Sequence, residues 1–172
     1  MDREIIAFTK TKLPYGWMGN MSPYPIIWDN KQWKTTEALF QAMRFPPESP
    51  FPELIREENS PMGAKLKAKG NAQWMNVEQL SDEDLANMEL CVRLKVEQHV
   101  NLVKDLLDTG DAIIYEDVTR RGSGGSNLFW GALKQPNGIW TGRNHLGKIW
   151  MKIREELKTN YNYEKDSTSD NF

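Results

Sequence analysis

The chain has 172 residues, 39% of them hydrophobic, which is enough for one domain with a sizeable core. Its formal net charge is -2, so the chain lacks the excess of basic residues that sequence-independent nucleic-acid binders use. Any nucleic-acid contact should therefore be local. The first ten residues carry charges at positions 2, 3 and 4 and no long apolar run, which argues against a signal peptide or membrane span. The single cysteine, Cys91, cannot form an intramolecular disulfide, and no Cys/His cluster has zinc-site spacing. We expect a soluble cytoplasmic protein without a metal or other cofactor.

The first part of the chain predicts short strands, a loop and a helix. Residues 4–8 have the pattern of a short strand, and the Pro- and Gly-rich stretch 10–25 predicts a structured loop. Residues 25–33 predict a hairpin that turns at Asp29 and Asn30. A helix follows, because Thr35 or Thr36 can cap its start and prolines stop it at 46 and 47.

The middle of the chain predicts mainly helices. Ser49-Pro50 and Ser60-Pro61 each predict the start of a short helix, with proline at its first position. Ser81 and Asp84 resemble a capping box, and apolar residues at helical spacing from 85 to 106 predict the longest helix. His99 lies on the apolar side of that helix, where we expect a packed core histidine.

The last part of the chain predicts a strand at residues 112–116, an exposed loop at 119–126 and a final helix from about Asn144. These elements give a mainly α (α+β) fold with a few short strands. We expect one compact domain over residues 1–159 and a polar C-terminal tail over residues 160–172.

Three polar residues share one face of the helix after Thr36. Glu37, Gln41 and Arg44 follow the i, i+4, i+7 spacing, and Glu37 lies in the first turn, where the helix dipole favours an anion. This face is either a solvated stripe or the rim of a cleft that holds a carboxylate. Spacing alone does not separate the two.

Seven short motifs occur in a recognisable order along nearly the whole chain, from about Phe8 to Leu157. They are FTKTKLPYGWMGNMSPYPI, WKTTEALFQAMRF, IREENSPMGAK, NAQWMNV, LLDTGDAIIYE, NLFWGA and GRNHLGKIWMKIREEL. In this order and at this spacing, the chain resembles the NADAR family, the YbiA-like N-glycosidases.

The resemblance implies a compact helical fold and hydrolysis of an N-glycosidic bond between a ribose-type sugar and a nitrogenous base. Described family substrates are ADP-ribose attached to guanine in DNA by a toxin transferase, and ribosylamino intermediates of riboflavin synthesis. Cleavage builds positive charge at the anomeric carbon, so the site needs a negative or nucleophilic group and a means of protonating the departing base.

Two residues match the catalytic positions of the family. Glu37 matches the glutamate of the family's EH motif, which acts as general acid/base or stabilises the oxocarbenium-like charge, and its place at a helix start favours the anionic role. Lys10 matches the lysine before PYG, to which a Schiff-base role on the anomeric carbon is assigned. An amine attacks only when it is deprotonated, and a surface lysine is the plain alternative. Lys12 is the second candidate.

Further residues match positions that would contact substrate. Trp74 and Trp130 could stack on a base or line the sugar pocket, or could simply be core, whereas Trp28, Trp33 and Trp150 suit packing. Gly131 permits close backbone approach, Glu116 matches an acidic position of unassigned role, and Gln41 shares the face of Glu37.

The remaining predicted contacts involve sugar or phosphate. Asn20 could orient the sugar or water, or simply form a turn. Arg44 and Asn144, in GRNHLG, could meet phosphate, although an ordinary helix cap also explains Asn144.

The chain departs from the family pattern at four positions. Gly19 replaces serine in the SN motif, Ala38 replaces the histidine after the glutamate, and Arg44 stands where lysine is usual. Asn127 replaces an aspartate before WG, so a charge that could position water or protonate the base is missing. The family positions make Gly19 and Asn127 candidate substrate contacts nevertheless. Loop 119–126 adds two arginines that could reach a nucleic-acid backbone.

Three functions follow from these residues. The first is removal of ADP-ribose from guanine in DNA or nucleotides, and the second is N-glycosidase action on ribosylamino-pyrimidine intermediates of riboflavin synthesis. The third is a non-catalytic module that binds ADP-ribose or NAD. The expected partners are such a nucleotide and ADP-ribosylated DNA, with no membrane. The sequence leaves the oligomeric state open.

Overall fold

The computed structural model describes the backbone of residues 2–169 and the side chains of residues 2–162. The α-helices are α1 (Thr36–Ala42), α2 (Phe51–Arg56), α3 (Pro61–Gly70), α4 (Asp82–Gln98), α5 (Val100–Asp108), α6 (Asn127–Trp130) and α7 (His145–Ser169). The strands are β1 (Ile5–Phe8), β2 (Ile26–Trp28), β3 (Lys31–Trp33), β4 (Ile113–Glu116), β5 (Leu133–Lys134) and β6 (Trp140–Thr141). Two 3₁₀ turns, η1 (Gly16–Met18) and η2 (Ala72–Trp74), complete the fold. The predicted mainly helical fold class is confirmed.

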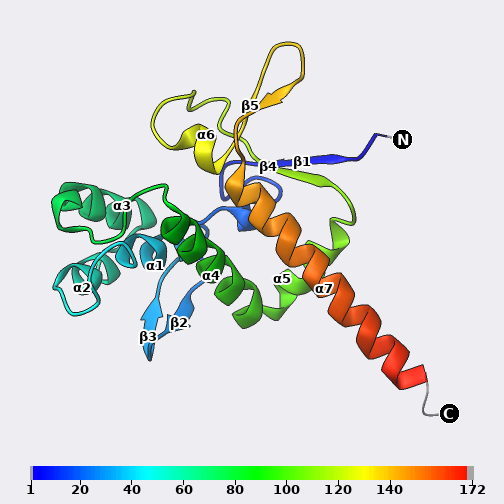
Figure 1. Ribbon diagram of the computed structural model, residues 1–172, viewed down its shortest axis with the longest axis horizontal. Coiled ribbons are helices and arrows are strands. Elements are labelled where there is room, and N and C mark those ends of the chain that lie inside the picture. The colour runs from blue at the N-terminus through cyan, green and yellow to red at the C-terminus, as the bar shows by residue number, and fades with distance from the viewer. Residues whose placement is uncertain (1, 170–172) are drawn as a thin grey trace.

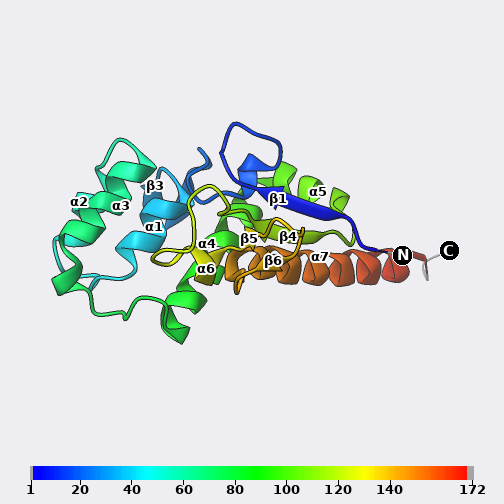
Figure 2. The same ribbon diagram turned by 90° about the horizontal axis from the view of Figure 1, so that it is seen from above.

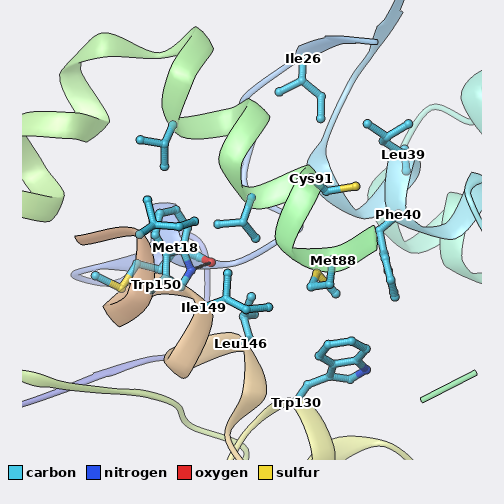
Figure 3. Packing of buried hydrophobic residues seen from close by; sticks show 14 of the residues in the cluster. Met18, Ile26, Leu39, Phe40, Met88, Cys91, Trp130, Leu146, Ile149 and Trp150 are labelled. Carbon is cyan, nitrogen blue, oxygen red and sulfur yellow. Dashed lines mark hydrogen bonds between the residues drawn. The ribbon is translucent and has the colours of Figure 1, made fainter. Parts of the chain in front are cut away.

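Helices α1, α2 and α3 lie together at one end of the molecule, while β1 and β4 lie over α7 on the other side of α4 (Figures 1 and 2). Helix α4 packs against both α1 and α7, and α7 packs against β4. The core forms where these elements meet, with Trp150, Ile149 and Met18 on one side and Phe40 and Trp130 at the edge of the cluster (Figure 3).

Strands β1 and β4 form a parallel pair, although most of the chain separates them. The register places Ile5 opposite Ile113 and Phe8 opposite Glu116. The predicted strands at 4–8 and 112–116 are confirmed, and their pairing brings the residues after Phe8 beside the residues after Glu116. Two segments of the predicted site therefore meet at one edge.

Local turn and cap signals explain the hairpin and the first helix. Asp29 and Asn30 have positive φ values of 52° and 59°, as a tight hairpin turn requires, and β2 pairs with β3 around them. The Thr35 side chain accepts a hydrogen bond from the Ala38 N–H at 3.2 Å, which caps α1. Ser60 caps α3 in the same way through the Gly63 N–H.

Several predicted helix limits are wrong. The helix predicted to extend to 106 breaks at His99, whose non-helical backbone separates α4 from α5, and α7 is the longest helix of the described structure. The His99 ring is only partly buried, lies against Tyr24 and contacts the Pro25 carbonyl oxygen at 2.6 Å. Ser49 does not cap α2, which begins at Phe51.

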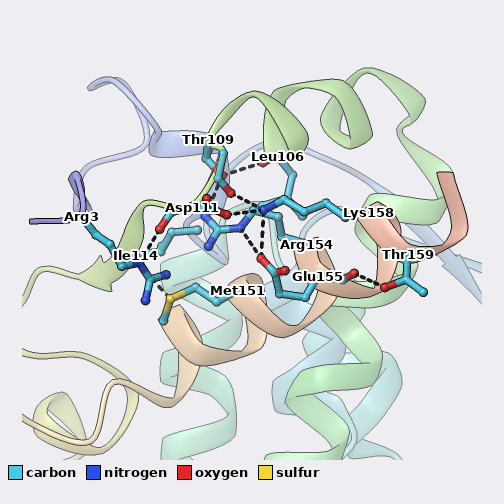
Figure 4. A network of polar contacts seen from close by, with 11 residues as sticks. Arg3, Leu106, Thr109, Asp111, Ile114, Met151, Arg154, Glu155, Lys158 and Thr159 are labelled. Atoms are coloured by element: carbon cyan, nitrogen blue, oxygen red, sulfur yellow. Dashed lines mark hydrogen bonds and ion pairs between the residues drawn. The ribbon is translucent and has the colours of Figure 1, made fainter. Parts of the chain in front are cut away.

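Helix α7 continues through most of the segment predicted as a tail. It ends at Ser169, and residues 170–172 lie outside the described part of the chain. Its buried Arg154 donates to the Thr109 hydroxyl at 3.0 Å, and Lys158 contacts Gly110 and Asp111 (Figure 4). These contacts attach α7 to the turn that leads into β4, and so fix the strand that ends at Glu116.

Candidate active site

The polar face of α1 is buried. Glu37, Gln41 and Arg44 keep only 8%, 5% and 6% of their surface exposed, so the interpretation as a solvated stripe is wrong. A buried carboxylate is costly unless it is hydrogen-bonded, and such groups often mark functional sites. The Glu37 carboxylate also acts on the Cys91 thiol of α4: burial raises the pKa of Cys91, and the Glu37 charge raises it further.

The three side chains form a hydrogen-bonded chain that ends at Asp84 on α4. Gln41 Nε2 donates to Glu37 Oε1 at 2.9 Å, and Arg44 Nη1 donates to Gln41 Oε1 at 3.3 Å. Arg44 then forms two bonds with the fully buried Asp84, from Nε to Oδ1 at 2.8 Å and from Nη2 to Oδ2 at 2.7 Å. The predicted shared face of 37, 41 and 44 is therefore present as a connected network.

Asn20 lies against the start of α1. Its carbonyl oxygen accepts the Glu37 N–H at 3.0 Å, and its side-chain Nδ2 contacts Met88 Sδ at 3.2 Å. Its Oδ1 is buried and has no hydrogen-bond partner. A buried acceptor without a partner is costly, so Oδ1 is available to a donor from a bound molecule.

The loop that carries Asn20 is held from inside by Lys95 of α4. The Lys95 ammonium group donates to the Trp17 carbonyl, to the Gly19 carbonyl at 3.1 Å and to Ser22 Oγ at 2.7 Å. Burial lowers the pKa of Lys95 to about 7. Because the Gly19 carbonyl accepts bonds from Lys95 and Ser22, Gly19 shapes this loop from inside the protein.

Glu116, the last residue of β4, is the second carboxyl group of the site. Burial raises its pKa and the Glu37 charge raises it further, while Arg121 and Lys65 act in the opposite direction. Arg121, from loop 119–126, is 3.6 Å from Glu116 through Nη2 and Oε2. Residues from α1, α3, β4 and this loop therefore act electrostatically on one another.

Trp130 packs against α1, and the residue after it packs against β4. Its ring meets Phe40 of α1 edge to face, with centroids 5.5 Å apart, and it is 9% exposed. The next residue, Gly131, lies so close to β4 that a Cβ there would come within 2.6 Å of the Glu116 carbonyl oxygen. Gly131 therefore lies close to the protein's own backbone, and the close approach to a ligand expected there stays a prediction.

Lys10 lies at the neighbouring strand end. It is exposed and lines a cavity of about 180 Å³ together with Thr9, Leu13, Asp117 and Arg120. Glu37 is not among the lining residues of this cavity. Lys10 follows β1 and Asp117 follows β4, and the Asp117 N–H donates to the Phe8 carbonyl at 2.8 Å, so Lys10 is next to the Glu116 segment.

Two predicted contact residues use their side-chain amides within the protein. Asn144, 3% exposed, donates to the Ile114 carbonyl at 2.8 Å and accepts the Glu116 N–H at 3.0 Å. Asn127 donates to the Gly122 carbonyl at 3.0 Å, which closes loop 119–126. Both hold the segments that present Glu116 and Arg121.

A scan against family models matches the NADAR domain over residues 7–158. The chain belongs to the NADAR family. It is 32% identical to the N-glycosidase YbiA of Escherichia coli over 157 residues, which cover 91% of each chain. It is also 29% identical to a riboflavin biosynthesis protein of Vibrio vulnificus, with 92% of this chain matching 40% of that protein.

The NADAR fold is also seen in a solved structure. The NMR structure of E. coli YbiA has a TM-score of 0.73, is 31% identical in sequence, and the match covers 94% of this chain and 89% of that one. Relatives named N-glycosidases support a hydrolase. In the described part of the chain, no group of three His, Cys, Asp or Glu residues could hold a metal ion. No helix there has the length and apolar character needed to cross a membrane.

Trp74, in another NADAR motif, is the last residue of η2. It is 58% exposed and stacks on Phe51 with ring centroids 6.3 Å apart. A largely exposed tryptophan is not core, and its contact with substrate stays a prediction.

Three charged residues of this NADAR site did not emerge from the sequence as site residues. Asp84 looked like a capping residue, and the Ser81 hydroxyl does accept its N–H at 3.2 Å, but its carboxylate binds Arg44. Lys95 is buried on α4, where a lysine is ordinarily a surface residue, and Lys65 is an exposed lysine of α3 that acts on Glu116 through its charge. No local signal identifies them, because their partners lie far away in the chain.

Proposed function

We propose that this protein is an N-glycosidase that hydrolyses the bond between ribose C1 and a nucleobase nitrogen, with ADP-ribose on guanine as the substrate. The observation that carries the proposal is a pair of carboxyl groups, the buried Glu37 and the partly buried Glu116, in which the pKa of Glu116 is raised by burial and further by the Glu37 charge. Two carboxyl groups whose surroundings differ are suited to separate acid and anionic roles.

Glu37 is the anionic member of the pair. The Gln41 amide donates to it, and its position in the first turn of α1 favours a negative charge. A carboxylate held in this way stabilises the positive charge that develops at C1 as the glycosidic bond breaks.

Glu116 is the proton donor. Burial raises the pKa of Glu116, and the Glu37 charge adds to this, so its protonated form persists to higher pH than that of an exposed glutamate. It gives its proton to the departing base nitrogen. The Asn20 Oδ1 atom, which is buried without a partner, accepts a hydrogen bond from a sugar hydroxyl or the attacking water.

Lys10 is the nucleophile. Its neutral amine bonds to C1 as the bond from C1 to the base breaks and the base takes the proton of Glu116. The ring oxygen then leaves C1 and takes a proton from the lysine nitrogen, which gives a protonated Schiff base between Lys10 and C1. Water adds to C1, the lysine leaves as a free amine, the proton that is released returns to Glu116, and the sugar ring closes again. The net reaction adds one water molecule across the glycosidic bond.

The test is hydrolysis of DNA that carries ADP-ribosylated guanine, followed by release of free ADP-ribose. We expect turnover by the natural protein and a loss of at least about 100-fold in kcat for Glu37→Gln, which keeps the shape of the side chain but not its charge. Binding of ADP-ribose without turnover, unchanged in Glu37→Gln, would instead indicate a non-catalytic module.

A second candidate substrate is a ribosylamino-pyrimidine phosphate, because one relative is named a riboflavin biosynthesis protein. A variant of Arg120 can distinguish the two substrates, because Arg120 lines the cavity beside Lys10 and forms no ion pair with Glu116 in the described structure. Arg120→Ala should weaken hydrolysis of the DNA substrate and spare the free nucleotide if the DNA backbone contacts this loop. Activity on the pyrimidine nucleotide alone would favour the metabolic function.

A further inference from the structure

Glu37 is the end of a relay of four buried side chains that starts on another helix. Asp84 is 0% exposed, and Arg44, Gln41 and Glu37 are each more than nine-tenths buried. Buried ionic groups cost free energy unless every member finds a partner, and each link of this relay is hydrogen-bonded. A hydrophobic replacement would fill the same space, so the presence of four polar groups calls for another reason.

The relay fixes which way the Gln41 amide faces. Arg44 has donors and no acceptor, so the Gln41 atom that contacts it at 3.3 Å must be Oε1. The Gln41 NH₂ group is then directed at Glu37 Oε1, 2.9 Å away. Without Arg44, the amide could rotate and present its oxygen to the carboxylate, which would remove the donor.

Asp84 in turn fixes Arg44. Its two oxygens accept from Nε and Nη2, and this two-point contact determines the plane of the guanidinium and therefore the direction of Nη1. The Phe40 ring lies 4.6 Å from the guanidinium carbon and limits its movement on another side. Asp84 Oδ2 also accepts the Leu80 N–H at 2.9 Å, which anchors the carboxylate itself.

We propose that Asp84 is a positioning residue for the glycosidase reaction, and that it acts on Glu37 through Arg44 and Gln41. This inference rests on the proposed function. In this proposal Arg44 orients Gln41, and the Arg44 guanidinium is already bound to protein groups. It also explains why the Ser81 helix start has an aspartate at position 84 whose carboxylate faces α1.

The test compares Asp84→Asn, Gln41→Met and the double variant. Each single change should lower kcat about 10- to 100-fold, as loss of an outer-shell partner does elsewhere, with KM changed much less. In the Gln41→Met background, Asp84→Asn should cause little further loss, because the link through which it acts is already removed. If instead the kcat losses of the two single variants multiply in the double variant, the relay is wrong, because a residue that only stabilises the fold acts whether or not Gln41 is present.

Glu156→Gln is the matched control. Arg93 on α4 donates to both carboxylate oxygens of Glu156 on α7. This change therefore also disturbs an arginine–carboxylate pair that involves α4, but one away from Glu37. It should leave kcat unchanged. If Asp84→Asn does not fold, Asp84→Glu keeps the charge but displaces the carboxylate, and the same comparison with Gln41→Met applies.

The two proposals fail in different ways. If the natural protein hydrolyses none of the substrates named above, the proposed function is wrong. If it is active and folded Asp84→Asn or Asp84→Glu retains full kcat, the relay is wrong and the function stands.

Discussion

The charge of Glu37, on α1, raises the pKa of Glu116, at the end of β4. Burial is the larger cause of the raised pKa of Glu116, and Arg121 opposes it from loop 119–126. Arg121 therefore lowers the pH at which Glu116 loses its proton. A proton donor works only on the acidic side of its pKa.

Replacement of Arg121 by methionine should move the alkaline limb of the pH profile. Arg121 favours the charged form of Glu116, so its removal raises the pKa of Glu116 and leaves the acid protonated to higher pH. The descending limb of kcat/KM should then shift to higher pH, measured with a free nucleotide substrate. Arg120→Met, in the same loop, should leave the limb in place, and an unmoved limb in Arg121→Met would contradict Glu116 as the donor.

Lys10 should be trapped on the sugar by borohydride. Reduction during turnover would join the Lys10 amine to ribose C1, and mass spectrometry of peptides would locate the added mass. Lys10→Ala should abolish the adduct. Lys12→Ala is the control, because it removes a nearby amine outside the cavity that Lys10 lines, and the adduct should persist. Loss of the adduct in the Lys12 variant alone would make Lys12 the nucleophile.

Lys95 should make the protein more stable as the pH rises above about 7. Burial lowers the pKa of Lys95 from its usual 10.5 to about 7 in the native state. Between these values the unfolded chain binds more protons, so the free energy of unfolding rises by up to about 1.4 kcal/mol per pH unit.

Urea denaturation between about pH 7 and about pH 8.5 would measure this slope. Lys95→Met should flatten it, even if the variant is less stable overall, because the titrating group is gone. Equal slopes in the two proteins would show that Lys95 is not the group responsible.

Loss of the Asn144 side chain should destabilise the fold. Asn144→Gly would leave the Ile114 carbonyl and the Glu116 N–H buried without partners, while it tolerates the positive φ of 53° at this position. We expect a loss of about 2 to 4 kcal/mol in thermal or chemical unfolding. Asn101→Gly, at an exposed position of α5, controls for the general cost of glycine in the chain. Equal losses would indicate that the Asn144 bonds contribute nothing.

Local chemistry was sufficient to predict the hairpin at Asp29 and Asn30 and a cap of α1 at Thr35 or Thr36, because a few neighbouring residues determine each, and Thr35 is the cap in the structure. The break at His99 was missed, since the apolar spacing continues across it while the backbone changes direction. The contact of His99 with the Pro25 carbonyl is a tertiary one that periodicity does not report.

The candidate site shows the same division. Helical spacing predicted that Glu37, Gln41 and Arg44 share a face, and the structure confirms this. Their burial depends on Asp84, which lies on a different helix, and no pattern within α1 contains that information. The pairing of β1 with β4, which brings Lys10 near Glu116, likewise depends on distant segments.

The parallel pairing of β1 and β4 also bears on the order in which the protein matures during synthesis. The Ile5–Phe8 segment leaves the ribosome well before its partner, Ile113–Glu116. Asn144, whose side chain bonds to that partner strand, is made later still. The nascent chain must therefore carry an unpaired hydrophobic edge until most of the polypeptide has emerged. Ribosome-bound intermediates that stop short of α7 should be catalytically silent, and they should be the species that chaperones engage.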